Sequence, residues 1–155
     1  YGLSQQLDIP VGHASTYIKK YHQVYPNISK YMNAQIEFCE KEGYVSTYFG
    51  RRRYIPEVYD ANRAVKEFGK RAAMNAPIQG TAADIIKKAM IEVDAYLEDK
   101  DTKMILQVHD ELVFDVPKDE LEMVTKDIIN IMEHVVDCPI ALKVSSTVGN
   151  TWMES

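Results

Sequence analysis

The stretch "MILQVHDELVFDV", residues 104–116, contains two runs of strand-forming residues with almost no spacer between them. Each run predicts a β-strand, and the short connection predicts a tight hairpin with His109 and Asp110 at or beside its turn. Removing a carboxylate from water costs on the order of several kcal/mol unless something compensates it. Two readings follow: either this is an exposed hairpin tip, or Asp110 and Glu111 hold a cation.

The spacing alone favours neither of these two interpretations over the other. A charged hairpin turn is common, and aspartate in particular favours turns. The flanking segments, "MILQV" and "LVF", are apolar enough that we expect both strands to be buried. Buried strands would hold the tip rigidly, which is how metal-binding carboxylates are usually supported.

Outward from the hairpin, the pattern predicts an α+β fold in which helices pack on a small, mainly antiparallel sheet. Pro26 ends the first helix, Gly43 ends the second, Asp60 caps the third, and Pro77 breaks or kinks the helix that contains it. A short strand in "YVSTYFG" and an extended arm in "GRRRYIPEV" separate the second and third helices. The predicted helices cover residues 12–25, about 27–42, 60–75, about 81–99 and 118–136, and a strand at 140–149 closes the chain.

Charge is unevenly distributed along the sequence. The net charge is −5, but residues 49–75 hold seven basic against three acidic side chains, a net charge of +4 that leaves −9 for the remainder. This asymmetry suggests a docking surface for an anion, although a solvated helix face with ion pairs is the more common explanation. Arg51, Arg52 and Arg53 lie in the extended arm, where they could fan to both sides and bind phosphate, or simply form a solvated basic loop.

A polar constellation lies in "RAAMNAPIQG", where Arg71, Asn75 and Gln79 recur at every fourth residue. If the helix continues past Asn75, these side chains share one face. They are residue types that donate hydrogen bonds to base edges and to sugar-phosphate oxygens. A polar stripe that faces solvent is the alternative, and for three residues it would normally be preferred.

The composition of the 155-residue chain sets further bounds. No apolar stretch approaches the roughly 20 residues that span a bilayer. Cys39 and Cys138 lie far apart without metal-ligand spacing, which favours free thiols in a reducing, cytoplasmic setting. The chain opens with Tyr1 and Gly2, a pair that often ends helices, so we expect a cut chain.

Four segments in this order resemble the bacterial DNA polymerase I family, the family A DNA polymerases: "YGLS", "GYVSTYFGRRRYIPEV", "RAAMNAPIQGTAADIIKKAMI" and "QVHDELVFDVP". The resemblance covers essentially the whole chain. In that family the polymerase domain is similar to a right hand with palm, fingers and thumb. The resemblance implies that residues 1–60 form the C-terminal half of the fingers and residues 61–155 the larger part of the palm.

The resemblance also implies roles for individual residues. Asp110 matches one of two aspartates that hold the two catalytic Mg²⁺ ions, Glu111 an auxiliary catalytic carboxylate, and His109 a contact to the primer end. Tyr1 and Gly2 match the end of the fingers helix beside the nascent base pair. Residues that match polar contacts along the primer–template minor groove are Arg71, Asn75 and Gln79.

These matches imply a template-directed DNA polymerase of the bacterial cytoplasm, associated with the nucleoid and not with membranes. Its partners would be primer–template DNA, deoxynucleoside triphosphates and the remainder of the polymerase domain. The second catalytic aspartate, the thumb and the nucleotide-binding part of the fingers helix have no counterpart in the sequence, so we expect the isolated chain to be inactive. The alternatives are a non-catalytic DNA-binding module on the same fold and an unrelated Mg²⁺-dependent phosphodiesterase.

Overall fold

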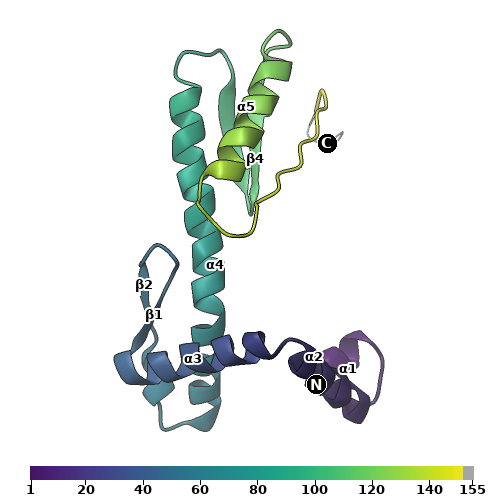
Figure 1. Cartoon of the computed structure of the whole chain (residues 1–155), viewed down its shortest axis with the longest axis vertical. Helices are drawn as coiled ribbons and strands as arrows, with labels where there is room; N and C mark the ends of the chain where they lie inside the picture. Colours follow the sequence, from purple (N-terminus) through teal and green to yellow (C-terminus); the bar gives the residue numbers. More distant parts are fainter. Residues whose placement is uncertain (152–155) are drawn as a thin grey trace. The chain divides into compact units, whose positions relative to one another are not determined.

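A computed structural model describes residues 1–151 of the chain. It separates into two compact units, of which the first is Tyr1–Ile78 and the second begins at Gln79. The described residues form five α-helices, one short 3₁₀ helix and four strands, and the strands pair as two antiparallel hairpins (Figure 1). This arrangement confirms the predicted α+β class.

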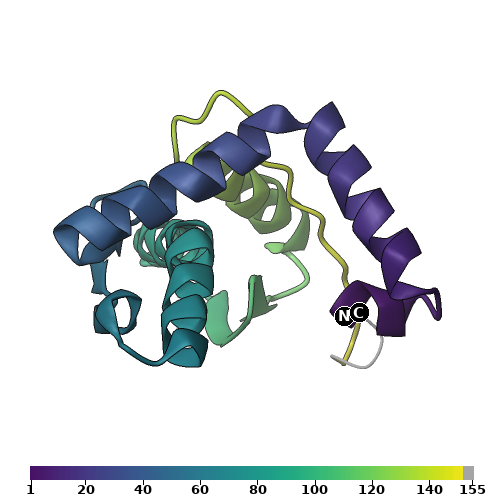
Figure 2. The same ribbon diagram turned by 90° about the horizontal axis from the view of Figure 1, so that it is seen from below.

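Three helices open the first unit: α1 (Gly2–Gln6), α2 (Val11–Val24) and α3 (Pro26–Glu42). Figure 2 shows α2 and α3 meeting end to end. Pro26 is the first residue of α3, where its missing N–H costs nothing because the first turn of a helix leaves those donors unpaired.

The end of α3 tests one prediction. Gly43 takes φ +79° and its N–H donates to the carbonyl of Cys39 at 2.8 Å, so the predicted end of α3 is confirmed. Tyr1 and Gly2 lie at the first turn of α1, where the N–H of Gln5 donates to the carbonyl of Tyr1 at 3.1 Å. That a further helix ends at this pair stays a prediction.

The first hairpin follows α3 and consists of β1 (Tyr44–Ser46) and β2 (Arg52–Tyr54), which confirms the predicted strand and extended arm. A 3₁₀ helix, η1 (Pro56–Tyr59), comes next. Together with α3 and the first half of α4 (Arg63–Tyr96), these elements enclose the core of the first unit. The buried residues of that core are Cys39, Val45, Ile55, Val58, Ala73 and Ala76.

Gly69 brings α4 unusually close to η1. A Cβ atom at this buried position would lie 2.8 Å from the backbone nitrogen of Val58 and 2.9 Å from the carbonyl carbon of Glu57. No side chain fits within those distances of a backbone. The helix can therefore approach η1 this closely only because residue 69 is glycine.

The prediction of two helices separated at Pro77 is wrong, because α4 runs through Pro77 as one helix of 34 residues. An internal proline costs about 3 kcal/mol or more. Residues on both sides of it are buried, with Ala73 in the core of the first unit and Val93 in the core of the second, and this burial stabilises the continuous helix.

The predicted cap of α4 also shifts by two residues. The side chain of Asn62 caps the helix by accepting the N–H of Ala64 at 2.9 Å. Asp60, the residue predicted for this role, instead accepts the N–H of Asn62 at 2.7 Å and so bends the chain just before the helix.

The second unit contains the hairpin that the opening stretch predicts. Strand β3 (Lys103–Val108) pairs antiparallel with β4 (Glu111–Asp115), with one irregularity between Met104 and Leu106. Helix α5 (Leu121–His134) follows, with Val124 and Ile128 buried as predicted. The core of this unit joins residues from α4, the hairpin and α5: Val93, Leu97, Val124 and Ile128, with Tyr96, Met104, Phe114, Val116, Ile131 and Met132 packed against them.

Two polar contacts tie the elements of the second unit together. The Glu120 carboxylate accepts the backbone N–H of Thr102 at 3.0 Å and its hydroxyl at 2.6 Å, and Thr102 is fully buried. The Tyr96 hydroxyl donates to Asp127 at 2.7 Å and so links α4 with α5. These contacts fix the start of β3 against the start of α5, and one helix against the other.

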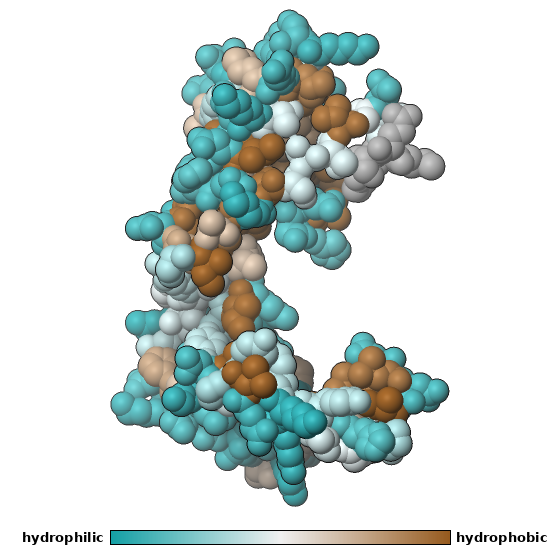
Figure 3. Space-filling view, turned by 45° about the vertical axis from the view of Figure 1, so that its right-hand side comes forward, coloured by the Kyte–Doolittle hydropathy of each residue, from teal (hydrophilic) through white to brown (hydrophobic). Residues whose placement is uncertain are grey.

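Two predictions for this unit are wrong. Residues 140–149 form no strand, because a strand needs a hydrogen-bonded neighbour and, within the described residues, β3 and β4 pair only with each other. The strands of this hairpin are not buried as predicted: no residue of β3 or β4 is fully buried, and Ile105 is 59% and Leu106 44% exposed. Apolar side chains also reach the surface in patches on the face drawn in Figure 3.

Candidate functional site

The hairpin tip consists of two residues, His109 and Asp110, between the paired residues Val108 and Glu111. His109 takes φ +55°, a left-handed conformation that is uncommon for residues other than glycine. The side-chain amide of Gln107 donates to the His109 carbonyl and so holds this bend from within the hairpin. Backbone strain of this kind clusters at functional sites.

The side chains at the tip are all exposed, so the prediction of an exposed hairpin tip is confirmed. Its carboxylates, Asp110 and Glu111, therefore remain in contact with water and need no partner within the chain. Cation binding, the other reading, is compatible with the same exposure, since a ligand can approach from solvent.

The exposed carboxylates of Asp110 and Glu111 are of the ligand type that Mg²⁺ prefers. Among residues 1–151, no three His, Cys, Asp or Glu side chains gather closely enough to hold a metal ion. Mg²⁺ usually keeps several waters and binds through one or two carboxylates together with substrate phosphates, rather than through a cage made by the protein alone. Asp110 and Glu111 fit that kind of partial ligand set.

Contacts at the far end of the hairpin hold it in place. Met104 and Phe114 pack against the core of the second unit. The Glu120 carboxylate anchors the start of β3 by accepting the hydrogen bond from the Thr102 hydroxyl. That hydrogen bond is the main reason that the pKa of Glu120 lies below its ordinary value. Sequence reasoning missed this anchor, because Thr102 and Glu120 are 18 residues apart and neither stands in a recognisable motif.

The three polar residues predicted to share a helix face all lie on α4 and are all exposed. The prediction required the helix to continue past Asn75, and α4 does so because it runs through Pro77. Arg71 and Asn75 belong to the first unit, and Gln79 begins the second. Tyr1 and Gly2, also predicted site residues, lie exposed at the start of the first unit.

The arginines of the first hairpin do fan to both sides. Arg53 pairs with the buried Val45, whereas Arg52 pairs with Ser46, so the two arginines point to opposite faces of the hairpin. The guanidinium of Arg52 lies over the ring of Tyr44, 4.7 Å from its centroid. Arg51, Arg52 and Arg53 are all exposed.

Part of the basic window matches the alternative of an ion-paired helix face. Lys66 and Lys70 lie 3.8 and 3.9 Å from Glu40, and Lys70 also lies 3.5 Å from Glu67. Exposed pairs of this kind contribute little to stability. They do partly neutralise the positive charge of the helical portion of the window. Any strong attraction for an anion is therefore expected from the arginines of the window rather than from these lysines.

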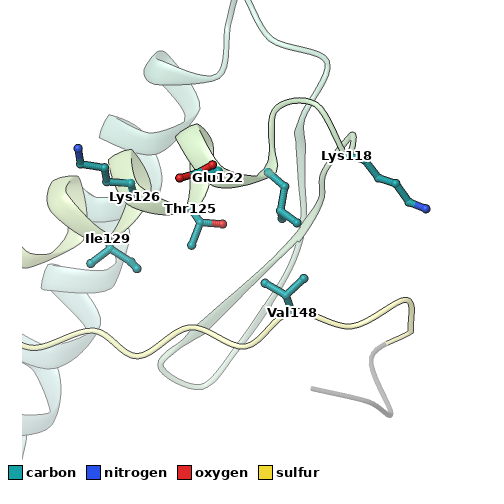
Figure 4. A pocket seen from close by; sticks show the side chains of 7 residues that line it. Lys118, Glu122, Thr125, Lys126, Ile129 and Val148 are labelled. Carbon is teal, nitrogen blue, oxygen red and sulfur yellow. The ribbon is translucent and has the colours of Figure 1, made fainter.

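A groove on the second unit contains none of the predicted site residues. It lies between α5 and the extended segment that carries Val148, and its lining includes Glu122, Lys126 and Ile129 (Figure 4). Cys39 is buried and Cys138 exposed, both as free thiols, as predicted. The described residues contain no helix of the length and apolar character that crossing a membrane requires.

Comparison with known proteins identifies the class. The model of DNA polymerase family A matches residues 1–154, and the chain therefore belongs to this family. DNA polymerase I of Bacillus subtilis is 43% identical over the whole chain, and the thermostable DNA polymerase I of Thermus aquaticus is 39% identical over 99% of it. The chain spans 18% of the length of each of these relatives.

A solved structure shows the same fold. The POL domain of Pol1 from M. smegmatis, in complex with DNA primer-template and dNTP, superimposes with a TM-score of 0.89 at 41% identity. The match covers 94% of this chain and 26% of that one. The fold described above is thus that of a part of a polymerase domain.

Proposed function

We propose that this chain is part of a template-directed DNA polymerase that adds nucleotides to the 3′ end of a primer. The observation that carries the proposal is the family match over residues 1–154, together with an anchored hairpin that presents Asp110 and Glu111 to solvent. The complex formed by the M. smegmatis relative supports primer–template DNA and deoxynucleoside triphosphates as partners.

Under this proposal Asp110 would hold magnesium, with Glu111 as an auxiliary carboxylate. When bound, Mg²⁺ supplies positive charge that stabilises the transferring phosphate and the leaving group. His109, next to Asp110 in the strained turn, would contact the primer end. The strain and the Gln107 hydrogen bond would position both residues before any ligand arrives.

Three exposed side chains of α4 would follow the minor groove of the primer–template duplex: Arg71, Asn75 and Gln79. The minor groove offers hydrogen-bond acceptors at similar places in every correct base pair. Contacts to these acceptors check the shape of a pair without selecting a sequence, as a copying enzyme requires. Tyr1 and Gly2 are proposed to lie beside the nascent pair.

The isolated chain is proposed to be inactive. The reaction uses two metal ions, and a single aspartate cannot position both of them. The exposed Ile105 and Leu106 support the idea that another part of the polymerase domain covers this hairpin. Under this proposal residues 1–60 belong to the fingers and residues 61–155 to the palm.

Asp110→Ala in the intact polymerase tests the catalytic role. We expect primer extension to fall by about 100- to 1000-fold, as when other groups that stabilise developing charge are removed. Asp119→Ala, an exposed aspartate away from the tip, is the matched control and should extend primers normally. Full extension by Asp110→Ala would contradict the catalytic assignment of Asp110, and DNA cleavage that needs no nucleotides would favour a phosphodiesterase.

Primer extension by the chain itself tests the proposal of inactivity. The chain would be assayed alone and then mixed with the missing amino-terminal portion of a polymerase domain. Extension only in the mixture is the expected result. Extension by the chain alone would show that one aspartate suffices.

A further inference from the structure

The outward face of the β1–β2 hairpin carries a cluster of aromatic rings and arginine. Tyr44 pairs with Tyr54 and Ser46 with Arg52, so these residues point away from the core side on which Val45 is buried. The rings of Tyr44 and Tyr54 are 5.6 Å apart, and the Arg52 guanidinium lies over Tyr44. Tyr54 is 68% exposed.

A second aromatic pair lies at the tip of the same hairpin. The rings of Tyr48 and Phe49 are 5.3 Å apart, edge to face, and Tyr48 is 68% exposed. The tip has a defined shape, because the N–H of Thr47 donates to the carbonyl of Arg51 at 2.9 Å and the Thr47 hydroxyl accepts the N–H of Arg51 at 3.2 Å. The turn thus holds the rings of Tyr48 and Phe49 outward.

We propose that this hairpin binds single-stranded DNA, with bases stacked on Tyr48 and Tyr54 and phosphates held by the arginines of the 51–53 run. Proteins that bind single strands without sequence preference combine exposed aromatic rings with positive charge, because every base has a face that can stack. A duplex does not offer such faces, since its bases are already stacked. DNA as the ligand rests on the proposed function, and the single-stranded part of the template is the occupant.

The arrangement of charge supports this choice of occupant. Three consecutive arginines flank the aromatic tip, and Arg52 is already stacked on Tyr44, which leaves the edge of its guanidinium available to phosphate oxygens. An aromatic surface that bound an apolar protein would not require such a charge run. Base stacking accounts for the rings, and phosphate binding accounts for the arginines.

The test compares two oligonucleotides of equal charge, a 15-mer of thymidylate and an abasic 15-mer, by fluorescence anisotropy with the full chain. We expect the thymidylate strand to bind at least about 10-fold more tightly, since stacking on one aromatic ring adds about 5-fold or more per base and two rings are available. Tyr48→Ala and Tyr54→Ala should each reduce this ratio, whereas Tyr54→Phe should keep it. Arg52→Ala should weaken binding to both strands. Tyr17→Ala removes a tyrosine of α2 that is 55% exposed and should change neither.

Equal affinity for the two strands, or no binding to either, would overturn the inference. Photo-crosslinking provides a second measurement that does not depend on how the isolated chain folds. A primer–template with bromodeoxyuridine in its overhang should crosslink within residues 48–54 of the intact polymerase, and crosslinks only elsewhere would also overturn it. Primer extension by the intact polymerase separates the two proposals. Normal extension together with no base-dependent binding contradicts this inference alone. Base-dependent binding together with no extension contradicts the proposed function alone.

Discussion

The two hairpins of this chain differ in how completely their own unit supports them. In β1–β2, Val45 is 1% exposed and lies in a core that α3, η1 and α4 close around it. In β3–β4, Met104 and Phe114 reach a core, but Ile105 and Leu106 remain exposed. The first hairpin is thus supported within its unit, whereas the second has apolar surface that its unit does not cover.

The difference also separates two kinds of chemistry. The β1–β2 hairpin carries arginine and aromatic side chains, and the β3–β4 hairpin carries the Asp110 and Glu111 carboxylates. Carboxylates repel DNA phosphates unless a cation lies between them. Under the proposed roles, the acidic hairpin would meet DNA phosphates only through a metal ion, whereas the basic hairpin would contact them directly.

The largest expected effect is in the core behind the acidic hairpin. Leu97→Ala removes a side chain that is 5% exposed and should destabilise the second unit by about 2–5 kcal/mol. Hydrogen exchange should show lost protection at β3 and β4, with β1 and β2 unchanged. Ile91→Ala, where the side chain is 70% exposed on α4, is the control. Equal loss in both hairpins would show that the two units unfold together.

The reciprocal change acts on the basic hairpin. Gly69→Ala places a methyl group 2.8 Å from the Val58 nitrogen, so α4 or η1 must shift, at a cost of about 1–3 kcal/mol. Exchange should now increase at β1 and β2 and stay the same at β3 and β4. Gly12→Ala, where nothing lies within 4 Å, should leave stability the same or slightly higher. A neutral Gly69→Ala would contradict the close approach.

Matched substitutions compare the hairpins directly. Val45→Thr buries an unpartnered hydroxyl and should cost about 1–3 kcal/mol in urea unfolding. Ile105→Thr changes an exposed residue and should stay within about 0.5 kcal/mol. The same Ile105→Thr change should reduce primer extension when the chain is mixed with the rest of a polymerase domain. If primer extension in this mixture is unaffected, the exposed face of β3–β4 is not the surface that the rest of the domain covers.

The smallest effect is a dependence on alkaline pH. Burial, and then the hydrogen bond to Asp127, raise the pKa of Tyr96 from 10.0 to about 12. A raised pKa in the folded state stabilises the fold below pH 10, and this contribution disappears as the pH rises from 10 to 12. Tyr96→Phe should flatten the loss of stability in that window, measured as the urea midpoint against pH, and Tyr17→Phe should not. An unchanged slope for Tyr96→Phe would contradict the Tyr96–Asp127 contact.

Local patterns predicted much of this fold. The apolar runs on either side of His109 predicted the β3–β4 hairpin, and Gly43 marked the end of α3 because its role is local. The prediction that the helix is interrupted at Pro77 failed. The free-energy cost of proline in a helix is a local property, whereas the burial of Ala73 and Val93 on either side cannot be predicted from local sequence. The strand expected at 140–149 failed for a similar reason, since its pairing depends on another segment.

The candidate site divides in the same way. The exposed tip with Asp110 followed from the spacing of the two strands. The anchor between Glu120 and Thr102 did not, because a contact across 18 residues leaves no periodic signal. Gly69 carries no signal either, since its importance comes from the backbone of η1 beside it. The metal and DNA roles of the site residues remain predictions.

The exposed apolar side chains of β3 also have a practical consequence for anyone who produces this chain alone. Within residues 1–151, β3 and β4 pair only with each other, so the outer edge of β3, beside exposed Ile105 and Leu106, can pair with the same edge of another molecule. Losses to aggregation should therefore grow with protein concentration and with temperature during expression. Co-expression with the other parts of a related polymerase domain, or a lysine on this edge, is the rational route to soluble material.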